Sequence, residues 1–149
     1  MLLTRKTDYA MVALAGLARR GQLGGSARDL AEELRLPLPL LRNLLKSMAS
    51  AGLLDSTRGP TGGYRLARPP EAITLAEVVE AIEGPVHLVT CCPGGGDGEP
   101  GHRCRLEDSC QIMGNVRQVH ERLMRFLQGV TLVEIATGRS GLQEIAHDR

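Results

Sequence analysis

The chain has 149 residues, of which 42% are apolar and only 2% aromatic. This length suits one domain with an appended element, and the scarcity of aromatic rings disfavours proteins that bind single-stranded nucleic acid by base stacking. The charge is unevenly divided: residues 1–68 hold 11 Lys/Arg and 5 Asp/Glu, a net +6, whereas residues 69–149 hold 7 and 12, a net −5. The basic half is therefore the candidate for nucleic-acid binding.

The first twenty residues bear on the compartment of the protein. In LTRKTDYAMVALAGLARR, charges stand on both sides of a short apolar run, a pattern that fits neither a signal peptide nor a membrane span. We expect a cytoplasmic protein without membrane contact. Its four cysteines then favour thiols or metal ligands, because reducing compartments rarely hold structural disulfides.

Three helices are predicted in the basic half. Apolar positions with helical spacing indicate a helix over residues 5–20 that ends at Gly21, and Ser26 can cap a second helix over residues 28–34. A third helix is expected from the prolines near residue 37 up to Gly52, since proline is tolerated in a first helical turn. Its apolar stripe consists of Leu41, Leu44, Leu45 and Met48. Its other face carries Leu40, Arg42, Asn43, Lys46 and Ser47.

A β-hairpin and a fourth helix are expected next. Leu53–Ser56 and Gly63–Leu66 can pair as two short strands across a turn rich in glycine and proline at residues 58–62. Thr74 begins a capping box, and the helix it opens ends at Gly84. The residues of this helix expected to be buried are Val78, Val79 and Ile82.

The second half begins with a long loop. Residues 90–110, here called the cysteine segment, contain all four cysteines with many glycines, and long loops in compact domains are usually functional or disordered. A long helix is expected afterwards, and then a short helix capped by Thr131. Apolar positions in the long helix alternate at spacings of four and three: Ile112, Val116, Val119, Leu123 and Phe126 or Leu127. Such a seam favours a homodimer interface, with packing on its own domain as the alternative.

The expected fold is mainly α: a winged helix-turn-helix with a small β-hairpin wing, a cysteine loop and a long dimerisation helix. The expected parts are a DNA-binding domain (1–84), a cluster-binding loop (85–110), a dimerisation helix with a short terminal helix (111–138) and a flexible tail (139–149).

This order of elements favours a regulator that binds double-stranded DNA over a protein-interaction module. Arg42, Asn43 and Lys46 fall within one helical turn and could meet base edges and phosphates together in a major groove. Arg58 at the wing tip suits a minor groove or a phosphate. The last candidates, Arg5 and Lys6, stand at a helix N-terminus that can hold phosphate.

The cysteine segment predicts a metal centre. Cys104 and Cys110 have five residues between them, and Cys91 and Cys92 stand upstream across a flexible stretch, so three thiolates could surround one centre. Soft thiolates select iron-sulfur clusters or zinc, and the spacing favours neither strongly. A metal-free thiol sensor is a further alternative. His102 is a substitute ligand.

No enzyme and no small-molecule substrate are expected. The chain lacks a set of nucleophile, base and acid, and its GGGDG run follows no predicted strand. The remaining histidines are most simply surface or packing residues: His87, His120 and His147.

Four stretches together resemble the IscR/NsrR family of regulators: LTRKTDYAMVALAGLA, RGPTGGYRLAR, the cysteine segment and LQGVTLVEIA. The resemblance covers about residues 1–138. It implies an iron-sulfur cluster held by three cysteines and DNA contacts from the wing arginine and the start of the recognition helix. The positions that match those DNA contacts are Arg58, Pro39, Leu40 and Arg42.

The resemblance also implies a ligand set for the cluster, either 2Fe-2S or 4Fe-4S. The expected cysteines are Cys104, Cys110 and Cys92, which is preferred to its neighbour Cys91 because Pro93 follows it as proline often follows a cluster ligand. Two features depart from the family: the gap before Cys104 is longer, and Met113 stands where some members have a ligating histidine. In related nitric-oxide sensors an aspartate of the partner subunit ligates the cluster. Asp8 matches it, and a helix-dipole contact is its alternative role.

Overall fold

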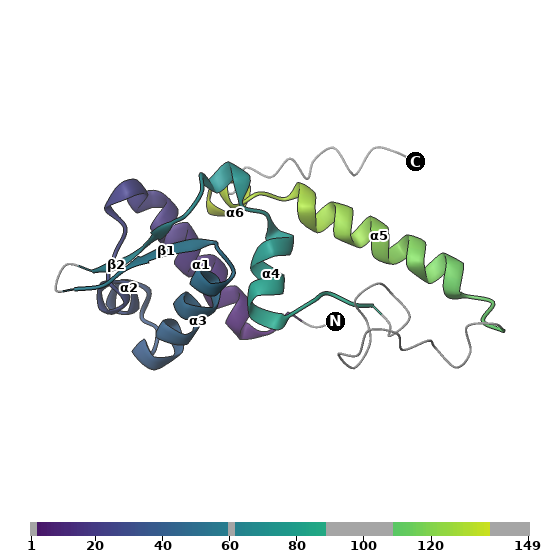
Figure 1. Cartoon of the computed structure of the whole chain (residues 1–149), viewed down its shortest axis with the longest axis horizontal. Coiled ribbons are helices and arrows are strands. Elements are labelled where there is room, and N and C mark those ends of the chain that lie inside the picture. Colours follow the sequence, from purple (N-terminus) through teal and green to yellow (C-terminus); the bar gives the residue numbers. More distant parts are fainter. Residues whose placement is uncertain (1–2, 60–61, 89–108, 138–149) are drawn as a thin grey trace.

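The computed structural model describes residues 3–59, 62–88 and 109–137. Most of them are helical, and a two-stranded antiparallel sheet forms the wing, so the expected fold class is confirmed. Figure 1 shows a bundle around α1 at one end of the molecule, the wing projecting from it, and α5 extending away from it. The elements in chain order are α1 (Arg5–Arg20), α2 (Ala27–Leu34), α3 (Leu38–Ser50), β1 (Leu54–Thr57), β2 (Gly63–Leu66), α4 (Leu75–Glu83), α5 (Met113–Gly129) and α6 (Leu132–Thr137). Two short 3₁₀ turns are also present, Gly21–Leu23 and Pro70–Ala72.

Local signals account for the helix boundaries. The hydroxyl of Thr4 accepts a hydrogen bond from Lys6 N at the start of α1, and the hydroxyl of Ser26 accepts one from Asp29 N at the start of α2. After α3, Gly52 adopts a left-handed φ of 74°, and Leu53 N donates back to Met48 O at 3.0 Å. This closes the helix with a Schellman motif.

The first strand therefore begins one residue later than predicted. Leu53 is buried, but its N–H is used by the end of α3, and β1 pairs with β2 only from Leu54, opposite Leu66. One further expectation is corrected: Ile82 of α4 is half-buried rather than buried, whereas Val78 and Val79 are buried as expected.

The core forms where α1 passes between the other helices. Its apolar face is inaccessible to solvent, and α2, α3, β1, α4 and α6 contribute side chains to the same cluster. The largest fully buried members are Leu14, Leu17, Leu30, Leu41, Leu45, Met48, Leu53, Ile73 and Leu132. Burial of each such side chain contributes about 1.5–3 kcal/mol, so this cluster fixes the winged helix.

The end of α5 is fastened to this core by backbone pairing. Leu75 N donates to Val130 O and Leu132 N donates to Ile73 O, each at 2.8 Å. α4 and α6 start on either side of this bridge, and in each a glutamate in the first turn bonds back to the capping threonine. Leu132 is buried against the core, so α6 packs on the winged helix while α5 extends outward.

Candidate DNA-binding surface and cysteine segment

The outer face of α3 is polar because its inner face is used by the core. Arg42, Asn43 and Lys46 are exposed, whereas the stripe of leucines and Met48 on the opposite face is buried. The sequence prediction for this helix is confirmed. Three side chains able to contact bases or phosphates therefore stand within one helical turn of a rigid helix.

The wing is held at a fixed distance from the helices by Gly25. Its N–H donates to Tyr64 O and its C=O accepts from Tyr64 N, both at 2.9 Å. The backbones approach so closely that a Cβ on Gly63 would collide with Gly25. Arg65 and Asp55 form a cross-strand ion pair at 3.2 Å. The exposed Arg58 at the wing tip is thus carried by an anchored hairpin.

α3 and the wing enclose a groove, which we call the α3–wing groove. It brings together four of the residues singled out in the sequence: Arg42, Asn43, Lys46 and Arg58. The rest of its lining is small or polar: Ala27, Ala49, Ser50, Ser56, Thr57, Gly59, Gly62, Gly63 and Tyr64. None of the described residues that line it carries a carboxylate. Within the described residues its three cations form no ion pair, so they are available to an anionic partner.

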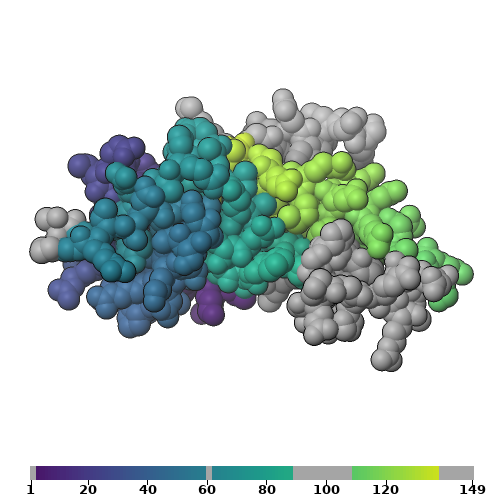
Figure 2. Space-filling view, viewed as in Figure 1, coloured from purple at the N-terminus to yellow at the C-terminus, as the bar shows by residue number. Residues whose placement is uncertain are grey.

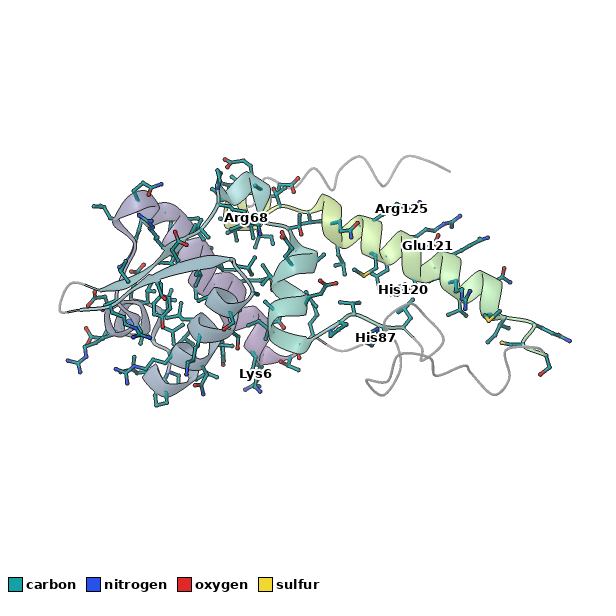
Figure 3. The ribbon with its side chains drawn as sticks, viewed as in Figure 1. Lys6, Arg68, His87, His120, Glu121 and Arg125 are labelled. Atoms are coloured by element: carbon teal, nitrogen blue, oxygen red, sulfur yellow. The ribbon has the colours of Figure 1, made fainter. Side chains whose placement is uncertain are left out.

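The other predicted DNA contacts lie outside this groove. Pro39 is exposed at the start of α3, and Leu40 is half-buried and packs on the core. Arg5 and Lys6 are exposed at the start of α1; Figure 3 shows Lys6 beside the end of α4. The structure thus places these four residues at two helix starts rather than in the groove.

An internal carboxylate occupies the helix start at which a phosphate was expected. Glu83 Oε1 accepts hydrogen bonds from Thr4 N at 3.1 Å, Thr4 Oγ1 at 2.6 Å and Thr7 Oγ1 at 2.5 Å. Bonds from the side chains of Thr4 and Thr7 lower the pKa of Glu83, helped by the charge of Lys6. Sequence reasoning missed this residue, and no local pattern signals it.

The cysteine segment lies largely outside the described residues, and so do Cys91, Cys92, His102, Cys104, His147 and the predicted tail. Cys110 is described: it is a half-buried free thiol just before α5. Asp8 is exposed in the first turn of α1. Within residues 3–59, 62–88 and 109–137, no three His, Cys, Asp or Glu side chains form a metal site.

Two histidines expected to be surface or packing residues have a further property. His120 of α5 is 6% exposed and His87 is half-buried. Among the residues that the structure describes, the Nδ1 atom of each is buried and has no hydrogen-bond partner. Figure 3 shows both near the side of α5 that faces the chain after α4.

The long helix has two apolar faces. Leu127 is 5% exposed and, with Leu123 and Met124, packs on Ala76, Val79 and Val86. A second face is open: Ile112, Val119 and Phe126 are 64%, 56% and 40% exposed. We call these three residues the α5 stripe. Of the two alternatives for the last seam position, Phe126 continues the open stripe and Leu127 does not. Figure 2 shows α5 forming the end of the molecule away from the wing.

Comparison with known proteins assigns the chain to a family. The Rrf2 profile, described as an iron-dependent transcriptional regulator, matches residues 3–138. The HTH-type transcriptional regulator IscR of Cereibacter sphaeroides is 40% identical over 108 residues, 70% of each chain. IscR of Klebsiella pneumoniae is 31% identical over 140 residues, covering 93% of this chain and 82% of the relative.

A solved structure supports the fold. IscR of T. potens superposes with a TM-score of 0.64 at 23% identity, covering 96% of this chain and 91% of that one. None of the helices in the described ranges is long and apolar enough to cross a bilayer. Because the relatives are transcriptional regulators and not enzymes, the expectation that this chain is no enzyme is confirmed. The chain belongs to the Rrf2 family and is an IscR-like, DNA-binding transcriptional regulator.

Proposed function

We propose that the chain works in the cytoplasm as a homodimer that binds an operator in double-stranded DNA, with an affinity set by an iron-sulfur cluster. The observation that carries DNA recognition is the α3–wing groove, whose described lining holds three cations outside any ion pair and no carboxylate. Neutralising phosphates supplies most of the affinity of such proteins for DNA, and contacts to base edges supply the specificity.

Each part of the basic surface has a distinct role in this proposal. Arg42 and Asn43 read base edges, because Arg pairs with guanine and Asn with adenine in the major groove. Lys46 and Arg58 contact the backbone, or Arg58 enters the minor groove. Pro39 and Leu40 bring the start of α3 against the duplex, and Arg5 and Lys6 add charge at the edge.

A second copy of the chain covers the α5 stripe in the proposed dimer. Its members recur every seven residues, as expected for a seam between helices. Each of the three large apolar side chains is at least 40% exposed, and such a group on one helix face favours an interface with another molecule. Packing on its own domain is the role of the opposite face, through Leu127. Two recognition helices then read two half-sites related by two-fold symmetry.

The donors present suit an iron-sulfur cluster. Cys92, Cys104 and Cys110 are the proposed thiolate ligands, and Cys110 is a free thiol beside the dimerisation helix. The partner subunit's Asp8 is the proposed fourth ligand, with Cys91 or His102 as substitutes. Asp8 is exposed, and Val12, one turn along the same face of α1, is 47% exposed. An exposed valine beside the carboxylate supports contact of this face with another subunit.

When bound, a cluster supplies a centre that reacts with oxidants or nitric oxide, and a carboxylate ligand would leave one iron easy to displace. The residues of the chain hold the two ends of the segment: Val86 is buried against α5 on one side, and α5 begins shortly after Cys110 on the other. A conformational change in the cysteine segment would therefore shift α4 and α5, the helices that support the two winged-helix domains.

Anaerobic purification tests this proposal. We expect a brown protein with stoichiometric iron and sulfide, whose absorption separates 2Fe-2S from 4Fe-4S. It should enrich a palindromic duplex from a randomised DNA library at physiological salt. A colourless protein with one zinc per chain would indicate a structural zinc site instead of a cluster. A metal-free protein that still binds DNA would indicate a thiol sensor. Failure to enrich any sequence would contradict the proposal that the protein binds a specific operator.

A further inference from the structure

The carboxylate of Glu83 joins two parts of the chain that are 76 to 79 residues apart. Glu83 is the last residue of α4, and its Oε1 accepts from the backbone N–H and hydroxyl of Thr4 and from the hydroxyl of Thr7. Three donors on one oxygen restrict how the side chain can rotate. The end of α4 and the first turn of α1 must therefore move together or break this contact.

Both sides of the contact are firmly held. Thr7 is fully buried, and the Thr4 hydroxyl also caps α1 through Lys6 N at 3.2 Å. On the other side, Val78 and Val79 bury α4 in the core and against α5. Glu83 and Thr4 are exposed, and an exposed ion pair on two flexible side chains would transmit little. Here, however, one acceptor oxygen is shared by three donors of a single helical turn, and one of these donors belongs to the buried Thr7.

The contact lies between the two parts of the chain that the proposed regulation must connect. Immediately after Glu83, Gly84 adopts a positive φ of 82°, and the chain then runs to Cys91 within eight residues of Glu83. The turn at the other side of the contact carries Arg5, Lys6 and Asp8. Glu83 thus stands between the chain that leads to the cysteines and the turn that carries candidate DNA contacts and the candidate fourth ligand.

We propose that Glu83 is a positioning residue that transmits the state of the cysteine segment to the first turn of α1. This inference rests on the proposed function. When the cysteine segment changes, the end of α4 shifts and carries Thr4 and Thr7 with it. Arg5 and Lys6 then meet the DNA backbone in a different place. Without the carboxylate, the two helices respond independently, and the state of the segment no longer reaches α1.

The test compares operator affinity between cluster-loaded and cluster-free full-length protein, using the enriched duplex as the probe. Allosteric couplings usually amount to about 5- to 150-fold, and we expect a ratio in that range for the wild type. In Glu83→Ala the ratio should fall to within about two-fold of unity. Glu83→Gln should keep most of it, because the amide oxygen still accepts from both threonines. Glu80→Ala, one turn earlier and exposed, is the matched control and should keep it fully.

Amide hydrogen exchange over residues 4–8 gives a second readout. Removing the cluster should change exchange of these amides in the wild type and leave it unchanged in Glu83→Ala. If Glu83→Ala does not fold, Thr7→Val removes one of the three bonds while keeping the buried shape, and it should lower the ratio partly. A wild-type ratio of one would overturn the proposed function. A cluster-dependent wild type with an equally dependent Glu83→Ala would overturn only the role of Glu83.

Discussion

The α3–wing groove and the cysteine segment depend on different physical signals. The groove is built by caps, an apolar stripe and a glycine contact, all of which act without a ligand. The cysteine segment has no apolar periodicity and is marked only by thiols and turn-forming residues. Folding energy can position a DNA-binding surface directly, whereas a cluster site gains its order from bound metal. We therefore expect the two regions to respond to mutation separately.

The largest expected effect is that of Cys110→Ser, which should abolish the cluster and leave the winged helix folded. Cys110→Ser should remove nearly all iron and sulfide, because a serine hydroxyl is a poor substitute for a soft thiolate. The winged helix should still melt cooperatively, since Cys110 lies outside the core clusters. Metal analysis and thermal unfolding after anaerobic purification check both parts. Cys91→Ser is the control and should keep the cluster; a stoichiometric cluster in Cys110→Ser would remove this residue from the ligand set.

The next effect concerns the stripe that joins two copies of the chain. Val119→Glu would place a charge in the seam, and an uncompensated buried charge costs about 3 kcal/mol or more, roughly 100-fold in the dimer dissociation constant. Sedimentation velocity over a concentration series measures it. Gln118→Glu adds the same charge at the neighbouring exposed position outside the stripe and should leave the dimer intact. Equal dimer stability in the two variants would exclude the α5 stripe as the interface.

A smaller effect is expected in the groove. Arg58→Ala should weaken operator binding by about 1–2 kcal/mol, roughly ten-fold, because a phosphate or minor-groove contact is lost. The melting temperature should not change, since the side chain is exposed. Fluorescence anisotropy at fixed salt gives the affinity. Arg125→Ala removes the same charge from α5, outside the groove, and an equal loss in this control would make the effect one of net charge alone.

The smallest expected effect is at Asp8. Asp8→Ala should keep the dimer but shift the absorption of the cluster and speed its loss to oxygen or nitric oxide. If Asp8 only interacts with the dipole of α1, its removal changes stability by about 0.3–1 kcal/mol and leaves the spectrum alone. Stopped-flow absorption of Asp8→Ala, with Cys91→Ser measured in parallel, decides whether Asp8 is a cluster ligand or only a helix-dipole contact. An unchanged cluster in Asp8→Ala and a lost one in Cys91→Ser would make Cys91 the fourth ligand.

Much of the winged helix could be predicted from local sequence, because caps and periodicity act over a few residues. Ser26, Thr74 and Thr131 each begin the helix expected of them. The start of β1 was misplaced by one residue since Leu53 closes the Schellman motif of α3. The end of α2 at Leu34 was predicted, but not the conformation of the next residue, Arg35, which adopts a left-handed φ of 53° that usually favours glycine.

The features that sequence could not predict are those between distant segments. The sequence predicted only that the helix containing Glu83 ends at Gly84, and the threonine partners of Glu83 lie 76 and 79 residues earlier in the chain. The choice between Phe126 and Leu127 likewise required knowing which face of α5 meets α4. Neither question has a local answer, because both depend on how helices pack.

The most direct test of the central claim measures the operator affinity of one anaerobic preparation before and after its cluster is removed by nitric oxide or a chelator. Iron, sulfide and the dissociation constant are determined on the same sample, and Cys110→Ser gives the cluster-free reference. We predict that the affinity changes at least about five-fold, the lower end of typical allosteric coupling, and that the treated wild type then matches Cys110→Ser. An identical dissociation constant at full and zero cluster content would contradict the account.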